Sequence, residues 1–211
     1  MGNGNVGVIV AAVVLVLVVV GIVVLLASMR LRAQVKAWGE LASELRLTIN
    51  RKGRPGAPVW LEGNYHGRPV ILDTYTKTRH HSVSGKRRAT VDTFTRLVMQ
   101  VSNPSVLSFE PSREGALAKV TQRIVGKDIQ TGDPELDKRL SINGEPEEGV
   151  QRLLTAEALR QPLLEAPKLD LRLSEAGELT YRQPGVEKDR QRLRSIFELL
   201  AALAREIEHA A

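Results

Sequence analysis

The chain opens with a long, uninterrupted run of apolar residues. Residues 8–27 read VIVAAVVLVLVVVGIVVLLA and hold no charged or strongly polar side chain. A helix of this length rises about 30 Å, the thickness of the hydrocarbon core of a bilayer. Valine and isoleucine favour strands in water, but a lone strand leaves its backbone unsatisfied in lipid. The run therefore predicts a transmembrane helix over residues 8–28, with residues 1–7 as an external stub.

A different pattern follows this run. Apolar side chains recur at steps of three and four residues, at Leu31, Val35, Trp38, Ala42 and Leu45. This spacing places them on one face of a helix. We expect a juxtamembrane amphipathic helix over residues 29–49, with Trp38 as an anchor in the core of the domain that follows.

Apolar and polar positions alternate over much of residues 59–110, which predicts antiparallel β-structure. The dipeptide His66-Gly67 marks a tight turn between two strands. Two further β-rich runs, 69–77 and 88–101, flank a basic stretch. Residues 77–88 are therefore expected at the tip of a long hairpin.

The C-terminal half mixes helical and strand patterns. The expected elements are helices over 112–126 and 187–208, two short helices meeting near Thr155, strands over 106–110 and 139–143, and a hairpin of KLDLRL and ELTYR around SEAG. Their order predicts an α+β fold. We expect an N-terminal transmembrane helix followed by one soluble domain, residues 50–211, of antiparallel hairpins packed with helices.

Two other interpretations of the N-terminal run fit less well. A cleavable signal peptide needs a basic start and an apolar core of about 7–15 residues, whereas MGNGNV has no basic side chain and the core is longer. N-myristoylation needs Ser or Thr where this chain has Val6. Arg30, Arg32 and Lys36 follow the run, and nothing basic precedes it. The positive-inside rule then predicts a single-pass protein of the inner (cell) membrane with a cytoplasmic C-terminal domain.

Charge is spread unevenly along the rest of the chain. Residues 30–96 hold 14 Lys and Arg against 5 Asp and Glu, whereas residues 97–211 hold 16 against 19. The basic part adjoins the predicted span. Anionic lipid attracts each nearby Lys or Arg by about 1 kcal/mol. A membrane surface therefore explains the asymmetry better than nucleic acid does.

The stretch YTKTRHHSVSGKRRATVDT, residues 75–93, is the first candidate site. It fits a solvated hairpin tip, a contact with anionic headgroups, or nucleic-acid binding. Nucleic acid is disfavoured because single-strand binders interleave aromatic side chains for base stacking, and Tyr75 is the aromatic residue near the cluster. Metal binding by His80 and His81 is disfavoured because neighbours on a strand point to opposite faces. The residues expected to contact lipid or a partner are Arg30, Arg32, Lys77, Arg79, Lys86, Arg87 and Arg88.

An acidic stretch, KDIQTGDPELD over residues 127–137, is the second candidate site. Asp133 and Asp137 are candidates for holding a hard cation, although their spacing differs from that of an EF-hand. A structural interpretation competes with this one. Asp133 would cap a short helix, Pro134 would take its first position, and Glu135 would favour the helix dipole.

Recognisable catalytic motifs are absent from the sequence. The chain has no Cys and four His, and none of the His lies at the end of an apolar strand, where a general base would be expected. The segment GNGNVG, residues 2–7, matches a dinucleotide fingerprint, but no strand precedes it and the apolar run follows. We therefore predict that the protein is not an enzyme and has no cofactor.

Four segments resemble a group of uncharacterised bacterial membrane-anchored proteins. They are WGELASELRL (Trp38–Leu47), LEGNYHGRPV (Leu61–Val70), TGDPELD (Thr131–Asp137) and LLTAEALRQPLL (Leu153–Leu164). The likeness covers nearly the whole chain, with Leu136 standing where many members have an aromatic residue. The resemblance implies one N-terminal span and a cytoplasmic α+β domain. It implies no substrate, cofactor or catalytic residue.

The sequence thus predicts a membrane-anchored, non-enzymatic interaction or scaffold module at the cytoplasmic face. Its expected partners are the lipid bilayer, touched through the basic hairpin 77–88, and a protein partner or a second copy of the chain. The alternative is a metal-dependent or otherwise catalytic membrane-tethered domain centred on residues 127–137.

Overall fold

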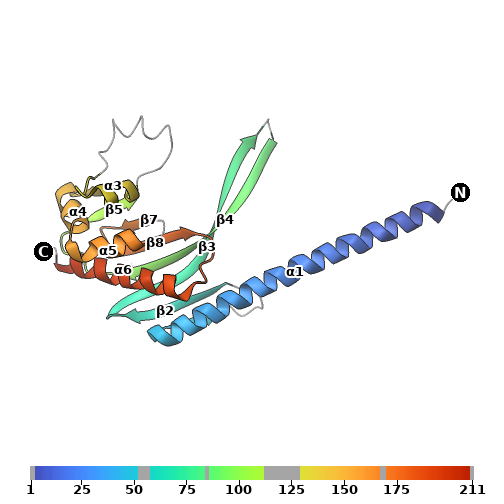
Figure 1. Ribbon diagram of the computed structural model, residues 1–211, viewed down its shortest axis with the longest axis horizontal. Helices are drawn as coiled ribbons and strands as arrows, with labels where there is room; N and C mark the ends of the chain where they lie inside the picture. The colour runs from blue at the N-terminus through green and yellow to red at the C-terminus, as the bar shows by residue number, and fades with distance from the viewer. Residues whose placement is uncertain (1–2, 52–57, 84–85, 112–128, 167–169, 210–211) are drawn as a thin grey trace.

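The computed structural model describes residues 3–51, 58–83, 86–111, 129–166 and 170–209 (Figure 1). The helix expected over residues 112–126 lies outside them. The helices are α1 (Asn3–Leu45), α3 (Pro134–Arg139), α4 (Glu147–Leu154), α5 (Glu157–Glu165) and α6 (Arg190–His209). The strands are β1 (Thr48–Arg51), β2 (Val59–Tyr65), β3 (Arg68–Val83), β4 (Lys86–Gln100), β5 (Ser108–Pro111), β6 (Ile142–Glu145), β7 (Asp170–Leu173) and β8 (Glu178–Pro184).

All of these strands belong to one antiparallel sheet. Within the described residues the sheet has eight strands, in the order β1-β2-β3-β4-β8-β7-β5-β6. Consecutive strands form the hairpins β2–β3, β3–β4 and β7–β8. The prediction of an α+β fold built on antiparallel hairpins is confirmed.

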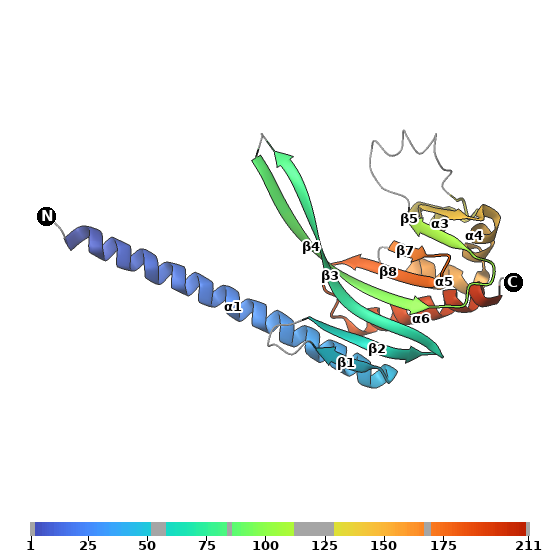
Figure 2. The ribbon, with the colours of Figure 1, turned by 180° about the vertical axis from the view of Figure 1, so that it is seen from behind.

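Helices cover one face of the sheet. In Figure 2 the strands lie in front, with α6 behind them and the C-terminal part of α1 beside β1 and β2. The core lies between the two layers. Its largest fully buried side chains include Trp38 from α1, Phe197 from α6, and Leu61, Leu72, Leu97, Met99 and Tyr181 from the sheet.

The α6 helix buries one face of its amphipathic sequence and begins at a capping residue. Asp189 Oδ1 accepts hydrogen bonds from the backbone N–H groups of Gln191 and Arg192, at 2.9 and 3.2 Å. This cap explains why the helix starts at Arg190 rather than at residue 187. The two short helices meet at Thr155 as expected, and α5 continues through Pro162.

The apolar run and the amphipathic segment form a single helix, α1. It is long and apolar enough to cross a membrane, and its large apolar side chains from Val13 to Leu26 are 51–65% exposed. The helix already includes Asn3, inside the segment expected as a stub, and it ends at Leu45 rather than at residue 49.

The early end of α1 has a clear local cause. Arg46 adopts a left-handed conformation, with φ of 56°, and the Leu47 N–H donates to the Ala42 carbonyl at 2.8 Å. This is a Schellman ending in which Arg46 stands where Gly is usual. Without a Gly to mark the stop, the sequence pattern runs on into Thr48–Arg51, which the structure places in strand β1.

Candidate functional site

The β3–β4 hairpin extends well beyond the rest of the sheet (Figure 1). β4 pairs with β8 from Phe94 to Gln100, but it pairs with β3 as far as Lys86. The basic stretch therefore lies in paired strands as well as in the tip, which corrects the expectation that the strands end near residues 77 and 88. In both ribbon views the hairpin and the N-terminal part of α1 project from the same side of the body.

The strand register gathers basic side chains on one face of this hairpin. Lys77 lies opposite Asp92, and the alternation of the strands puts Arg79 and Arg88 on the same face, which continues from Tyr75. Arg79 Nε lies 2.7 Å from Asp92 Oδ2. Among the described residues, no ion pair engages Lys77 or Arg88. We call Lys77, Arg79 and Arg88 the basic face.

The reverse face of the hairpin is different. Its described side chains are Thr74, Thr76, Thr78, His80, Ala89, Val91 and Thr93. None of them carries a formal charge when His is neutral, and Val91 is 61% exposed. At these described positions the two faces of the hairpin differ, and the basic face is the one suited to anionic groups.

The base of the hairpin is braced by aromatic and ionic contacts. The Tyr75 and Phe94 rings stack with centroids 5.3 Å apart, and the Arg96 guanidinium lies 5.5 Å from the Tyr75 centroid. Arg96 also makes two hydrogen bonds to Asp73, at 3.0 and 2.6 Å, which raise its pKa. These contacts join β3 to β4 at the level where the hairpin leaves its neighbour β8.

The structure brings together part of the set predicted from sequence. Lys77, Arg79 and Arg88 share the basic face, whereas Arg30 and Arg32 lie on α1, directly after its apolar segment. Lys86 and Arg87 occupy strand positions, and their side chains, like that of Arg30, lie outside the described set. The part that Arg96 plays in bracing the hairpin was missed, although the two-residue alternation of β4 already placed it beside Phe94.

The acidic stretch forms a helix cap, as its structural interpretation predicted. Asp133 Oδ1 accepts from the backbone N–H groups of Glu135 and Leu136, at 2.9 and 3.4 Å, and Pro134 is the first residue of α3. Asp133 Oδ2 lies 2.7 Å from Arg160 Nε. The backbone N–H of Glu135, followed by Arg160, lowers the pKa of the Asp133 carboxyl.

Asp137 is also engaged within the loop. Its Oδ1 accepts hydrogen bonds from both the backbone N–H and the hydroxyl of Thr131, each at 2.7 Å. Across the described ranges, no three His, Asp or Glu residues cluster closely enough to hold a metal ion. The carboxylates of this stretch therefore act here as ties between α3, its preceding loop and α5.

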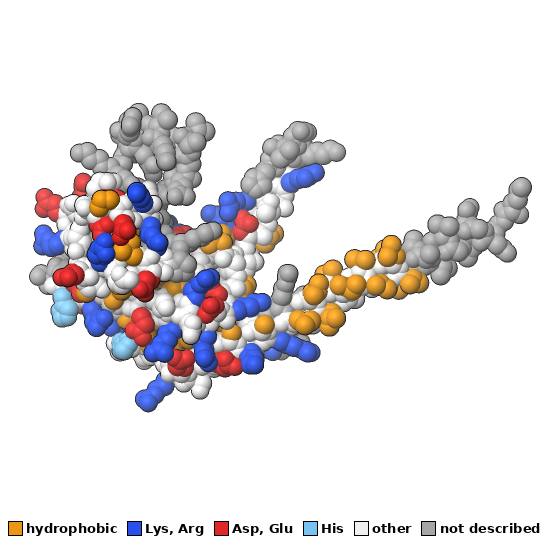
Figure 3. Space-filling model, viewed as in Figure 1, with side chains coloured by type: hydrophobic (Ala, Val, Ile, Leu, Met, Phe, Trp, Pro, Cys, Tyr) orange, Lys and Arg blue, Asp and Glu red, His pale blue; other side chains and the backbone are white. Residues whose placement is uncertain are grey.

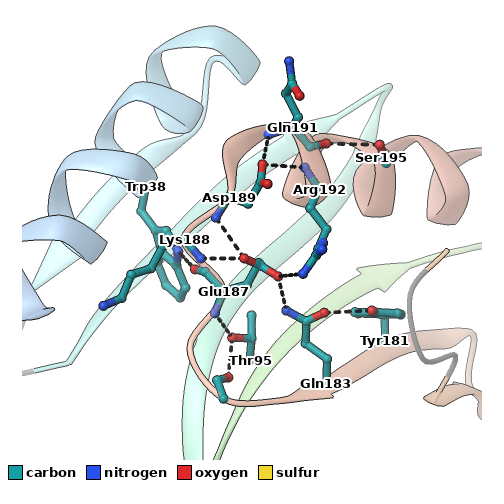
Figure 4. Close-up of polar contacts among 11 residues, drawn as sticks. Trp38, Thr95, Tyr181, Gln183, Glu187, Lys188, Asp189, Gln191, Arg192 and Ser195 are labelled. Atoms are coloured by element: carbon teal, nitrogen blue, oxygen red, sulfur yellow. Dashed lines mark hydrogen bonds and ion pairs between the residues drawn. The ribbon is translucent and has the colours of Figure 1, made fainter. Parts of the chain in front are cut away.

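A third group of polar contacts joins α1 to the body of the domain (Figure 4). Trp38 is fully buried, and its indole N–H donates to the Glu187 carbonyl at 2.9 Å. The backbone N–H of Glu187 donates to Thr95 Oγ1, and that hydroxyl donates to the Gly185 carbonyl, both at 2.8 Å. The loop between β8 and α6 thus connects α1 to the middle of the sheet.

The Glu187 side chain completes this set of contacts between α1, the loop before α6 and the sheet, which we call the joint. Its carboxylate accepts from Gln183 Nε2 at 2.9 Å and from the backbone N–H groups of Lys188 and Asp189 at 2.8 and 2.9 Å. Burial by itself would raise the pKa of Glu187, but these hydrogen bonds and Arg192 outweigh it and hold the pKa below its usual value. The sequence pattern placed Glu187 at the start of the helix expected over 187–208, whereas the structure places it in the loop before α6.

Two clefts on the helical side have mixed charge. One, of about 400 Å³, is lined by Glu148, Arg152, Glu206 and His209 among others. The second, of about 320 Å³, lies between α5 and α6 and is rimmed by Glu165, Arg194, Glu198 and Arg205. Because both acidic and basic side chains line each cleft, neither favours a ligand of one charge as the basic face does.

No family model, no curated protein and no solved structure matches this chain. The resemblance drawn from the sequence therefore stays a prediction, and the candidate sites rest on the chain's own geometry.

Proposed function

We propose that this protein is a single-pass membrane protein whose α+β domain is a non-enzymatic interaction module at the cytoplasmic face. In this proposal the basic hairpin touches anionic lipid headgroups. The observation that carries it is the position of the hairpin, which projects from the body to the same side as the apolar part of α1 (Figure 3). A domain tethered by that helix cannot leave the vicinity of the surface, so weak contacts suffice.

The charge of the hairpin supports contact with an anionic surface. Its basic face offers three cationic side chains against one carboxylate, that of Asp92. Each Lys or Arg close to anionic lipid contributes about 1 kcal/mol. The attraction decays within a Debye length, about 8 Å at physiological salt. Contact by the basic face would therefore be salt-sensitive and close-range.

Nucleic acid is a poorer partner for this face. Binding of single strands relies on aromatic rings that are free to stack on bases. The Tyr75 ring is already stacked on Phe94 and contacts the Arg96 guanidinium. Among its described side chains, the basic face therefore offers cationic groups but no free aromatic ring on which a base could stack.

The metal-dependent alternative finds no favouring observation. A cation at Asp133 and Asp137 would have to compete with Arg160 and with the backbone and hydroxyl donors that now bond to these carboxylates. Millimolar Ca²⁺, Mg²⁺ or Mn²⁺ is therefore expected to leave the melting temperature unchanged, and a clear upward shift would revive that alternative.

The absence of Cys from the chain makes a direct test practical. A single Thr90→Cys on β4 is labelled with a fluorophore in the full-length protein, reconstituted in bilayers that carry a headgroup-attached quencher. Quenching is expected to rise with the anionic lipid fraction and to fall with salt. Neutralising the basic face with Lys77→Gln, Arg79→Gln and Arg88→Gln should weaken contact by about fivefold per charge.

The matched control removes the same charge from the body of the domain. Lys138→Gln, Arg152→Gln and Arg205→Gln alter exposed residues far from the hairpin in sequence, and they should leave the quenching of the Thr90 label unchanged. Quenching that does not depend on the anionic lipid fraction would refute the lipid contact. Quenching that falls equally in both triple variants would refute it as well.

A further inference from the structure

The last turns of α1 are built into the core of the domain. Trp38 and Leu41 are 0% exposed, and Ala42 is 3% exposed. The indole N–H of Trp38 is bonded to the Glu187 carbonyl. A helix whose end is buried and hydrogen-bonded in this way cannot swivel without opening the core.

Ion pairs along the surface hold α1 parallel to its neighbour α6. Arg190 lies 3.4 Å from Glu40, and Arg194 lies 2.9 Å from Glu44. Such exposed pairs contribute little energy one by one. They nevertheless act at two successive turns of α1, so they oppose rotation of the helix against the body.

The helix is also uninterrupted between the apolar segment and the domain. Residues 22–38 contain neither Gly nor Pro, the residues at which helices usually kink. The hairpin is likewise uninterrupted, because the β3–β4 ladder is continuous as far as Val83 and Lys86. The apolar segment of α1 is thus connected to the hairpin through the joint and the sheet without an interruption.

We infer that α1 is a rigid strut that sets the height of the hairpin, so that the basic face meets the headgroups of the same bilayer that holds α1. This inference rests on the proposed function, because it names which membrane the basic face touches and what fixes the distance. A flexible tether would instead let the domain tumble and present any of its surfaces.

The first measurement tests the strut without reference to lipid contact. Spin labels at Met29→Cys, at the end of the apolar segment, and at Glu175→Cys, in the β7–β8 turn, report the distance between helix and body in the reconstituted full-length protein. Both side chains are exposed. We expect a single narrow distance distribution that is the same in neutral and anionic bilayers. A broad distribution would overturn the strut, whatever the hairpin does.

The second measurement changes the height alone. Seven helix-forming residues inserted between Arg32 and Ala33 lift the body by about 10 Å and keep the rotational phase within about 20°. Seven Gly and Ser residues at the same place have equal length but leave the domain free to approach the surface.

The two insertions are expected to act differently on the Thr90 label. The helical insertion should abolish most of the quenching by headgroup lipids, whereas the flexible insertion should retain a substantial part of it. Equal quenching in the original protein and the helical-insertion variant would overturn the inference. A narrow Met29–Glu175 distance combined with no quenching in the original protein would instead refute the lipid contact and leave the strut standing.

Discussion

Gly177 and Gly185 have the same backbone conformation but different surroundings. Their φ angles are +79° and +84°, yet a Cβ on Gly177 would lie 2.1 Å from the Val101 carbonyl oxygen, whereas a Cβ on Gly185 meets nothing within 4 Å. Gly177 also ties the β7–β8 turn to the segment that follows β4, because its carbonyl accepts from the Val101 N–H at 2.8 Å. The space available for a Cβ atom, and not the backbone conformation alone, should therefore decide how much an Ala substitution destabilises the fold at each of these two positions.

We predict that Gly185→Ala lowers the free energy of unfolding by about 1–2 kcal/mol, the usual cost of a left-handed non-Gly residue. Gly177→Ala should lower the free energy of unfolding by at least about 2 kcal/mol more than Gly185→Ala does. The reason is that the backbone at Val101 or Gly177 must move to make room for the added methyl group. Urea unfolding of the detergent-solubilised protein, followed by tryptophan fluorescence, measures both. Equal losses would mean that the approach of Val101 to Gly177 is not a constraint.

Glu187 should make the stability of the domain sensitive to acid. Its pKa in the folded protein lies below its value in the unfolded chain, which is about 4.3. The carboxylate therefore stabilises the fold above that pH, and this contribution is lost as the pH falls through the folded pKa.

We predict that Glu187→Gln is less stable than the original protein at neutral pH and that the gap narrows steadily below about pH 4. Unfolding free energies from pH 7 down to pH 3 measure the gap. The control is Glu175→Gln, an exposed residue in the β7–β8 turn, which should give a gap near zero throughout. A Glu187→Gln gap that stays constant over this range would contradict the assigned role of the carboxylate.

At the scale of elements, the attachment of α1 to the body of the domain should depend on Trp38 rather than on the surface ion pairs. Trp38→Phe removes the donor to the Glu187 carbonyl and part of a fully buried ring. We predict a loss of about 2–3 kcal/mol, from the hydrogen bond and the lost volume together. Glu40→Gln, which breaks an exposed pair, should cost less than about 1 kcal/mol. Comparable losses in thermal or urea unfolding would argue against this ranking.

A helix or strand can be predicted from the sequence when the residues that specify it are close together along the chain. The apolar run, the amphipathic α6 and the β7–β8 hairpin are encoded in neighbouring residues, and all were predictable. The end of α1 was not, because Arg46 takes a conformation for which sequence favours Gly. The extension of β3 beyond residue 77 and of β4 before residue 88 was missed because polar residues such as Thr78, Arg79 and His80 carry no apolar alternation.

The sheet order and the joint were beyond sequence patterns for another reason. The pairing of β4 with β8, and of β5 with β6 and β7, joins segments far apart along the chain. The bond from Trp38 to Glu187 spans 149 residues. Patterns of two- and three-residue spacing carry no information about such contacts, although Trp38 itself was recognisable as a core residue.

At the scale of the whole molecule, α1, which is long and apolar enough to cross a membrane, is continuous with an α+β body and a projecting basic hairpin. The proposed roles of the hairpin, the strut and the cytoplasmic location all depend on where that helix resides. If α1 spans the bilayer with Arg30 and Arg32 on the inner side, every one of these surfaces faces the cytoplasm.

The most direct measurement uses the exposed Glu175→Cys variant of the otherwise Cys-free chain. Intact cells that make the protein are treated with a membrane-impermeant maleimide, before and after permeabilisation, and the membranes are washed at alkaline pH. We predict no labelling in intact cells, full labelling after permeabilisation, and retention of the chain in the washed membranes. Labelling in intact cells, or release of the chain by the wash, would contradict the account.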